Sequence, residues 1–317
     1  MRLLVTRRMT EAAERAMTAR FDTTIRQDAA PLAVADARAA LRDFDAIIPT
    51  LGDAFTAEAF AGRGLRTRLV ANFGAGFNHI DVDAARAAGV VVTNTPGVVT
   101  DATADIAMTL ILATARRAGE GERILRAGGW EGWQPTQMLG RHVTGGIVGI
   151  VGMGRIGKAI AARCHLGFGM RVVFHNRSRV SALDIPAMQL ADIDALLAVA
   201  DFVVLAVPGG AGTRHMIGAA ELARMRHDAF LINISRGDVV DEAALVRALA
   251  AGQIAGAGLD VYEHEPRMPE ALRAMENVTL LPHLGTATAE TRTAMALRAM
   301  ANVVALDEGR EPPDRVA

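Results

Sequence analysis

The chain has 317 residues, which is enough for two domains of ordinary size. Hydrophobic residues make up 51% of it, and the net charge of −1 gives no electrostatic reason to expect nucleic acid or an anionic membrane as a partner. No apolar stretch reaches the ~20 residues of a transmembrane helix, and the apolar run within residues 1–9 is too short for a signal peptide. The single cysteine, Cys164, excludes an intramolecular disulfide framework, so we expect a cytoplasmic protein.

The first hundred residues alternate short apolar segments with alanine-rich segments. This alternation predicts buried parallel strands joined by crossover helices. The expected strands are Leu3–Thr6, Ala46–Pro49, Leu69–Asn72 and Val90–Thr93, and the expected helices are Glu11–Arg20, Pro31–Leu41 and Asp81–Ala88. A further helix is expected from Thr100 to about Arg117, and its nearly continuous apolar faces predict burial between domains or at a subunit interface.

A second alternation follows a loop that contains glycine and tryptophan. Its expected strands are Ile147–Val151, Arg171–His175, Phe202–Ala206, Phe230–Ile234, Ala255–Asp260 and Val278–Leu281. These strands match the size of a doubly wound dinucleotide domain, and a long helix at about Ala289–Leu306 should cross back to the first domain. The sequence therefore predicts an α/β protein with two doubly wound parallel-sheet domains and an active site in the cleft between them. The expected substrate-binding domain is 1–98 plus 286–317, and the expected dinucleotide-binding domain is 99–285.

Gly152, Gly154 and Gly157 follow one of these strands directly and open a helix. At this spacing the first glycine permits a tight turn, the second lets a pyrophosphate approach the backbone, and the third lets the helix pack on the strand. The N–H groups at the start of that helix would face the phosphates. We interpret the motif as a dinucleotide site, with an ordinary tight turn as the alternative.

The residues after the next strand bear on the choice between NAD and NADP. NAD sites usually carry an acid about 20 residues after the glycines, where it binds the ribose 2′-OH. Here Asn176 stands at that spacing, followed by Arg177, Ser178 and Arg179. Amide, hydroxyl and guanidinium groups can bind a 2′-phosphate that a carboxylate would repel. We predict that NADP(H) is preferred, and a solvated basic turn in an NAD(H) enzyme is the alternative.

Arg236, Glu265 and His283 stand just after three successive expected strands. Ligands of open parallel sheets bind beyond the carboxyl ends of the strands, so these side chains should share a cleft with the glycine turn. A guanidinium can grip the carboxylate of a 2-keto acid, and a histidine paired with a carboxylate can supply a proton to the alkoxide. With a dinucleotide present, this set predicts hydride transfer to a small carbonyl acid.

Each of these residues also has a simpler interpretation. Arg236 could be a surface cation, His283 an ordinary loop histidine, and Glu265 a solvated carboxylate, with Glu263 standing nearby in the same segment. In the first domain, the loop 72–78 contains Gly74, Ala75 and Gly76. Its N–H groups could hold a substrate carboxylate, or it could be a simple strand–helix turn.

With these motifs in order, the chain resembles the D-isomer-specific 2-hydroxyacid dehydrogenase family over nearly its whole length. The matching segments are Asn72–Asp81, Asn94–Gly97, Gly149–Gly157, Ile234–Gly237, Gly258–Pro266 and Pro282–Thr288. The resemblance implies two Rossmann- or flavodoxin-like domains and a homodimer, with Arg236 as substrate clamp, His283 as proton donor and Glu265 as its partner. It also implies that Asp260 contacts the nicotinamide carboxamide, that Thr103 lies near the nicotinamide, and that Ala75 and Gly76 donate to the substrate carboxylate.

Further positions complete the expected site. On the substrate side they are Leu51 and Gly74, and on the cofactor side they are Met153, Arg155, Ile156, Val207, Pro208, Thr213, Ile234, Arg236, His283 and Gly285. The run 172–179 and the loop 130–133 are most similar to NADP-preferring glyoxylate/hydroxypyruvate reductases, in which that loop can reach a neighbouring subunit's pocket. Simple interface packing of its two tryptophans is the alternative. We therefore expect NADPH-dependent reduction of glyoxylate, hydroxypyruvate or a sugar-derived keto acid to a D-2-hydroxy acid.

Other members of the family fit less well. Its formate dehydrogenases use glutamine where Glu265 stands, and its longer 3-phosphoglycerate dehydrogenases have a regulatory domain for which too little chain follows His283, although a short version stays open. An NAD-dependent dehydrogenase of another 2-hydroxy acid is the main alternative. A redox-sensing corepressor is an alternative of a different class, but no zinc motif, disordered extension or basic nucleic-acid face favours it. The segment 207–213 carries smaller residues than is usual at the adenine end.

Overall fold

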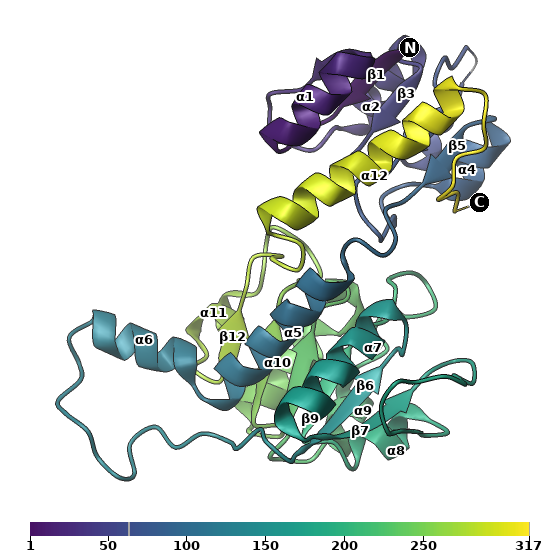
Figure 1. Cartoon of the computed structure of the whole chain (residues 1–317). Coiled ribbons are helices and arrows are strands. Elements are labelled where there is room, and N and C mark those ends of the chain that lie inside the picture. Colours follow the sequence, from purple (N-terminus) through teal and green to yellow (C-terminus); the bar gives the residue numbers. More distant parts are fainter. Residues whose placement is uncertain (63, 317) are drawn as a thin grey trace. The chain divides into compact units, whose positions relative to one another are not determined.

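The computed structural model describes residues 1–62 and 64–316, and the chain divides into two compact units. Unit 1 consists of Met1–Val99 and Thr286–Ala317, and unit 2 of Thr100–Gly285. Each unit has one sheet in which every strand pair of the described residues is parallel, with helices packed on it (Figure 1). The expected α/β class with two parallel-sheet domains is confirmed.

Unit 1 has a five-stranded sheet in the order β2-β1-β3-β4-β5, which is the flavodoxin-like order. Its strands are β1 (Arg2–Val5), β2 (Asp22–Ile25), β3 (Ala46–Ile48), β4 (Leu69–Ala71) and β5 (Val91–Thr93). Its helices are α1 (Glu11–Arg20), α2 (Val34–Asp43), α3 (Ala57–Phe60), α4 (Val82–Ala87) and α12 (Ala289–Asp307). Successive strand residues point to opposite faces, so Leu4 and Ile47 enter one core cluster and Leu3 and Ile48 the other.

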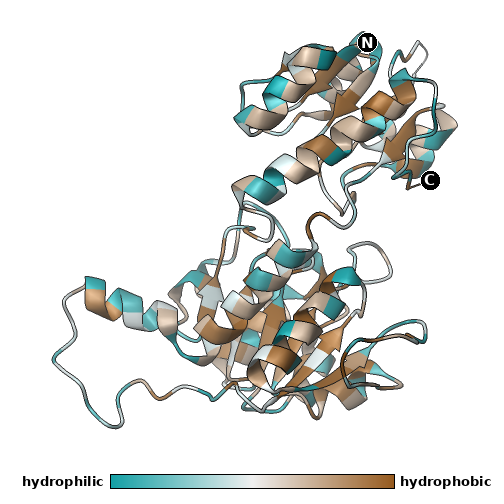
Figure 2. Ribbon diagram, viewed as in Figure 1, coloured by the Kyte–Doolittle hydropathy of each residue, from teal (hydrophilic) through white to brown (hydrophobic). Residues whose placement is uncertain are grey.

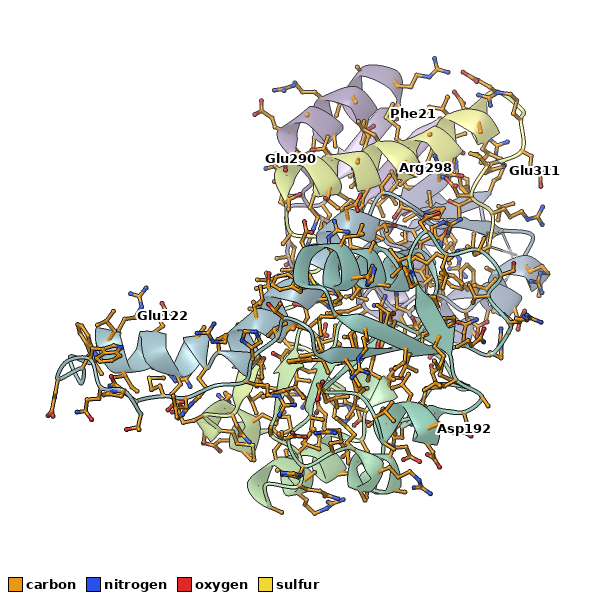
Figure 3. The ribbon with its side chains drawn as sticks, turned by 60° about the horizontal axis from the view of Figure 1, so that its bottom comes forward. Phe21, Glu122, Asp192, Glu290, Arg298 and Glu311 are labelled. Carbon is orange, nitrogen blue, oxygen red and sulfur yellow. The ribbon has the colours of Figure 1, made fainter. Side chains whose placement is uncertain are left out.

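The C-terminal helix α12 completes one of these two cores. Ala296, Ala299 and Val303 are fully buried and pack in the cluster that contains the strand residues of that face. The segment after α12 is anchored by the buried Asp314, which accepts two hydrogen bonds of 2.6 Å from Arg298. Arg298 lies on α12 (Figure 3). Both ends of the chain are therefore structural parts of unit 1.

Unit 2 has a seven-stranded sheet in the order β12-β11-β10-β9-β6-β7-β8. This is the Rossmann order with one added strand. The strands are β6 (Ile147–Val151), β7 (Arg171–His175), β8 (Ala187–Gln189), β9 (Phe202–Leu205), β10 (Phe230–Asn233), β11 (Gly256–Leu259) and β12 (Val278–Leu280). The α-helices are α5 (Thr100–Ala115), α6 (Ala118–Arg126), α7 (Arg155–Ala162), α8 (Ile193–Leu197), α9 (Ala219–Arg224), α10 (Glu242–Ala250) and α11 (Glu270–Ala274), with a π-helical turn η1 (Arg163–Gly167) and a 3-10 turn η2 (Gly237–Val239). Hydrophobic residues concentrate on the strands and on the helix faces that cover them (Figure 2).

Several elements differ from the sequence-based expectation. The edge strands β2 and β8 were not expected, because they are short, half-exposed and without an apolar run. The helix expected to reach Arg117 ends at Ala115, and a separate helix α6 begins after Arg117, whose backbone is left-handed (φ 54°). The buried face of α5 packs on the sheet of its own unit. Among the described helices, none combines the length and hydropathy needed to cross a bilayer.

Candidate active site

The candidate cofactor and catalytic residues of unit 2 gather at the carboxyl ends of its strands. Gly152, Asn176, Val207, Arg236, Asp260 and His283 each follow a strand of this parallel sheet. Because parallel strands end at the same edge, the chain brings these residues to one side without any long-range signal in the sequence.

The three glycines of the turn after β6 differ in what requires them. A methyl group added at Gly152 (φ +99°) would lie 2.7 Å from the carbonyl oxygen of Ala206, and one added at Gly157 would lie 2.2 Å from the Gly152 oxygen. An added methyl group at Gly154 would meet nothing within 4 Å in the described structure. The fold itself therefore needs the first and third glycines, whereas only a ligand close to the backbone would need the second.

The turn after β7 carries three exposed polar side chains, those of Arg177, Ser178 and Arg179. Asn176 lies between this turn and the glycine turn. Its Oδ1 accepts a hydrogen bond from Met153 N–H (3.2 Å), and its Nδ2 donates to the Ser178 carbonyl oxygen (3.0 Å). Neither guanidinium forms an ion pair with any described residue. The two cations are thus displayed beside the glycine turn with their hydrogen-bonding groups unused.

The expected adenine-end residues lie in the loop after β9. Thr213 donates from Oγ1 to the Pro208 carbonyl oxygen (2.8 Å) and so closes this loop, which begins at Val207. Ile234, directly after β10, is buried. These residues shape the same sheet edge with backbone and apolar groups.

Arg236 follows β10 and is half-buried. Its Nη1 donates to the neighbouring Ser235 carbonyl oxygen (2.8 Å), but its buried Nε has no hydrogen-bond partner among the described residues. Burial lowers the pKa of the guanidinium, and the negative charges of Glu265 and Asp238 partly oppose that shift. A cation held in this way, with unused donors, is suited to bind an anionic group.

His283 and Glu265 form a hydrogen-bonded pair. The distance from His283 Nδ1 to Glu265 Oε2 is 2.9 Å, and Glu265 Oε1 accepts a hydrogen bond from Tyr262 N–H (3.1 Å). Burial acts to raise the pKa of Glu265, but the hydrogen bond and charge of His283, with smaller contributions from Tyr262 and Arg236, hold it below its ordinary value. The backbone of His283 is left-handed (φ 56°), an uncommon state that is concentrated at functional sites.

Asp260 fixes the loop that carries His283. Its buried carboxylate accepts hydrogen bonds from Leu284 N–H (2.6 Å) and Gly285 N–H (2.8 Å), and its carbonyl oxygen accepts one from His283 N–H (2.9 Å). Burial raises the pKa of Asp260, and the hydrogen bond from Leu284 and the charge of His283 oppose that shift. Thr103 Oγ1 donates to the Gly285 carbonyl oxygen (3.2 Å), so both residues implied at the nicotinamide end support one loop.

Glu263 belongs to a different group of side chains. It accepts hydrogen bonds from His215 Nε2 (2.8 Å) and Arg214 Nη2 (3.1 Å), while its N–H donates to the buried Glu242 (2.8 Å). Glu265 is therefore the carboxylate that contacts His283. Sequence reasoning did not identify Tyr262, whose hydroxyl donates to the Leu281 carbonyl oxygen (2.9 Å) and ties the ends of β11 and β12 together.

In unit 1, the loop after β4 is organised by its carbonyl oxygens. Asn72 Nδ2 donates to the carbonyl oxygens of Gly74 (2.9 Å) and Gly76 (3.0 Å), and Asn94 Nδ2 donates to that of Ala75 (2.8 Å). The N–H groups of Ala75 and Gly76 make no hydrogen bond in the described structure, so they are available as donors. Leu51, in the loop after β3, has an exposed side chain.

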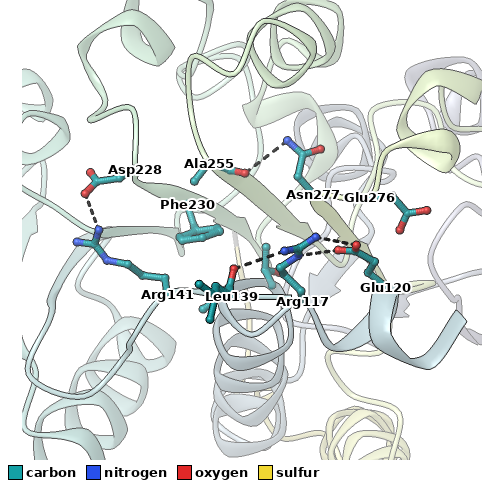
Figure 4. A pocket seen from close by; sticks show the side chains of 12 residues that line it. Arg117, Glu120, Leu139, Arg141, Asp228, Phe230, Ala255, Glu276 and Asn277 are labelled. Atoms are coloured by element: carbon teal, nitrogen blue, oxygen red, sulfur yellow. Dashed lines mark hydrogen bonds and ion pairs between the residues drawn. The ribbon is translucent and has the colours of Figure 1, made fainter. Parts of the chain in front are cut away.

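A cavity of about 380 Å³ lies at the other end of the unit 2 strands, their amino ends (Figure 4). It is lined at the amino ends of β10, β11 and β12, among others by Phe230, Ala255 and Asn277, and Arg117 and Arg141 contribute charged groups that are already paired with Glu120 and Asp228. None of the candidate site residues lines it. This cavity is therefore separate from the strand-end site.

Comparison with known proteins decides the family. A model of the NAD binding domain of D-isomer specific 2-hydroxyacid dehydrogenases matches residues 108–285. The chain belongs to this family. The glyoxylate reductase of Thermococcus onnurineus is 41% identical over 320 residues, covering 99% of this chain and 95% of that protein, and the glyoxylate reductase of Thermococcus kodakarensis is 46% identical over 281 residues, covering 87% and 84%.

A solved structure also resembles this 2-hydroxyacid dehydrogenase over its whole length. An NADPH-dependent glyoxylate/hydroxypyruvate reductase from Sinorhizobium meliloti, solved in complex with NADP and malonate, is 36% identical with a TM-score of 0.88, and the match covers 100% of this chain and 96% of that one. The chain is therefore an NAD(P)-dependent oxidoreductase of the 2-hydroxyacid dehydrogenase family.

Proposed function

We propose that this dehydrogenase reduces small 2-keto acids with NADPH, taking glyoxylate and hydroxypyruvate as substrates and giving the D-2-hydroxy acid where a stereocentre forms. The observation that carries the proposal is the 2.9 Å hydrogen bond between Glu265 and His283, at the strand-end edge that also holds Arg236 and the glycine turn. The names of the relatives, glyoxylate reductase and glyoxylate/hydroxypyruvate reductase, support the choice of substrates.

His283 is the proton donor in this proposal. Its Nδ1 faces Glu265, so Nε2 is the ring nitrogen left to give a proton to the carbonyl oxygen of the substrate. The lowered pKa of Glu265 keeps this carboxylate ionised at neutral pH, where it stabilises the imidazolium. Glu265 therefore acts through His283.

Arg236 binds the carboxylate of the substrate. Its partly desolvated guanidinium has donors that no described residue uses, and a carboxylate can accept two of them in a fixed orientation. The same positive charge stabilises negative charge that develops on the keto oxygen. In unit 1, the proposed substrate-binding residues are Leu51, Gly74, Ala75 and Gly76, and the N–H groups of Ala75 and Gly76 are donors suited to a carboxylate.

The glycine turn fits a dinucleotide, because Gly154 leaves open the space that a side chain would fill. When bound, the reduced nicotinamide supplies the hydride that adds to the carbonyl carbon. Backbone N–H groups at the start of α7 hold the pyrophosphate, and Arg177, Ser178 and Arg179 hold the 2′-phosphate that distinguishes NADP(H) from NAD(H). The proposed remaining cofactor contacts are Thr103, Met153, Arg155, Ile156, Asn176, Val207, Pro208, Thr213, Ile234, Asp260 and Gly285.

We also propose a cytoplasmic homodimer. The segment that begins with α6 extends away from the sheet of unit 2 (Figure 1), and Trp130 and Trp133, which follow α6, are exposed. Exposed aromatic groups gathered on an extended segment are typical of subunit contacts. Light scattering of the purified protein tests the dimer, and a monomer at micromolar concentration would contradict it.

Initial rates with glyoxylate and hydroxypyruvate, each with NADPH and with NADH, test the proposed reaction. A much higher kcat/KM with NADPH is expected. Equal or better rates with NADH would favour an NAD-dependent dehydrogenase of another 2-hydroxy acid, and the basic turn would then be a surface feature. No turnover with any short 2-keto acid would refute the reductase proposal and leave the redox-sensing binding protein as the alternative.

A further inference from the structure

The basic turn after β7 is held by side chains. Residues 176–180 make no backbone-to-backbone hydrogen bond in the described structure, and Arg177, Ser178 and Arg179 are exposed to solvent. A turn without backbone bonds would sample many conformations, and the entropy lost on fixing it would weaken any ligand that it binds. Some other group must therefore set its shape.

Gln189, on the edge strand β8, supplies that group. Its Oε1 accepts a hydrogen bond from Val180 N–H (3.0 Å), and its Nε2 donates to the carbonyl oxygens of Ser178 (3.0 Å) and Asn176 (3.4 Å). One amide side chain thus contacts both ends and the middle of the turn. Strand β8 lies beside β7 with Gln189 paired to Phe174, so the sheet itself fixes where this amide stands.

The contacts of Gln189 continue to the glycine turn. The Ser178 carbonyl oxygen, which accepts from Gln189, also accepts from Asn176 Nδ2 (3.0 Å), and Asn176 in turn accepts from Met153 N–H (3.2 Å). The hydroxyl oxygen of Ser178 also accepts a hydrogen bond from Asn176 Nδ2 (3.2 Å). Because the hydroxyl is an acceptor in this bond, its own proton is free to donate. The network therefore links the turn that would bind pyrophosphate to the turn that would bind the 2′-phosphate.

We propose that Gln189 is a positioning residue for cofactor selectivity: it holds Arg177, Ser178 and Arg179 in the arrangement that binds the 2′-phosphate of NADPH. This inference rests on the proposed NADPH-dependent function and adds a residue outside the glycine motif and outside the basic turn. Gln189 itself carries no charge, and both ends of its amide are already engaged by the turn. Its effect should therefore be larger for NADPH than for NADH, which lacks the 2′-phosphate.

The test compares three variants by steady-state kinetics with NADPH and NADH. Gln189→Leu keeps the size of the side chain but removes its hydrogen bonds, and Gln189→Glu keeps the acceptor for Val180 but replaces the donor with a negative charge. Gln253→Leu makes the same change at an exposed glutamine after α10 and is the matched control. If the lost ordering weakens NADPH binding by the free energy of about one hydrogen bond, the KM for NADPH should rise about tenfold.

We expect a larger rise in the KM for NADPH than in the KM for NADH in both Gln189 variants, with Gln189→Glu the more severe, and a smaller change in kcat than in KM. Hydrogen exchange of residues 176–182 should accelerate in Gln189→Leu, which separates local loosening from global unfolding. If the KM rises equally for the two cofactors, or if Gln189→Leu keeps the wild-type preference for NADPH, the proposed role of Gln189 is refuted but the cofactor proposal is not. A wild-type enzyme without NADPH preference would refute the cofactor proposal and this inference with it.

Discussion

Replacing Glu265 with glutamine tests the proposed role of the Glu265–His283 pair. Glutamine keeps the size of the side chain and can still accept a hydrogen bond from His283 Nδ1, but it removes the negative charge 2.9 Å away. A charge-assisted hydrogen bond is stronger than a neutral one by roughly 1.5 kcal/mol. Because 1.36 kcal/mol is a factor of ten in rate, loss of this difference at the proton donor should lower kcat for keto-acid reduction by about tenfold.

The assay measures kcat and kcat/KM for hydroxypyruvate reduction between pH 5 and 9. Glu263→Gln is the matched control, because Glu263 stands two positions away and contacts His215 and Arg214. This control should keep the wild-type kcat. An unchanged kcat in Glu265→Gln, or the same loss in both variants, would refute the reasoning that the Glu265 charge acts on His283.

Three further predictions concern binding and stability. Gly154→Ala should unfold at the wild-type temperature but bind the cofactor at least tenfold more weakly in a titration. Gly152→Ala should lose about 2 kcal/mol of folding stability in thermal or urea unfolding, because its backbone is left-handed and the added methyl group meets a carbonyl oxygen. Equal stability of the two variants would contradict this prediction. Arg236→Lys should lower kcat/KM for hydroxypyruvate by about 100-fold through loss of the bidentate contact, and a change below threefold in steady-state assays would remove Arg236 as the carboxylate clamp. Asp314→Ala should lower the free energy of unfolding by about 2 kcal/mol, since it leaves a buried hydrogen-bond network without its acceptor, while the exposed Glu311→Ala should change it by less than ~0.5 kcal/mol in the same urea titration.

The sequence predicts the central strands well because burial on both faces leaves a plain signal. Val203 and Val204 of β9 are fully buried, and such continuous apolar runs are hard to mistake. The edge strands β2 and β8 escape this signal, because one side of each strand is open to solvent and threonine or glutamine is tolerated there. Helix α6 escapes it as well, since two glycines interrupt its pattern and none of its residues is buried.

The candidate site is predictable only to the level of strand ends. Arg236, Glu265 and His283 can be placed at one edge by counting strands, but the choice between Glu265 and Glu263 depends on the path of the segment between them. That path is set by close packing at Gly237, where an added methyl group would lie 1.8 Å from the carbonyl carbon of Tyr262. Contacts of this kind, like those of Gln189 with its turn, come from tertiary structure and leave no pattern in the sequence.

Unit 1 is built from two segments that are far apart in the sequence, and this affects how the chain can fold during synthesis on the ribosome. Residues 100–285 are complete, with their own sheet and cores, before residues 286–316 have been translated. Until α12 emerges, Leu3, Val5 and Leu69 have no helix residues Ala296, Ala299 and Val303 to cover them. The second unit can therefore fold during translation, whereas the first waits with one apolar face of its sheet covered only in part, by Ala13 and Met17 of α1. This reverses the usual order in which the N-terminal domain folds first.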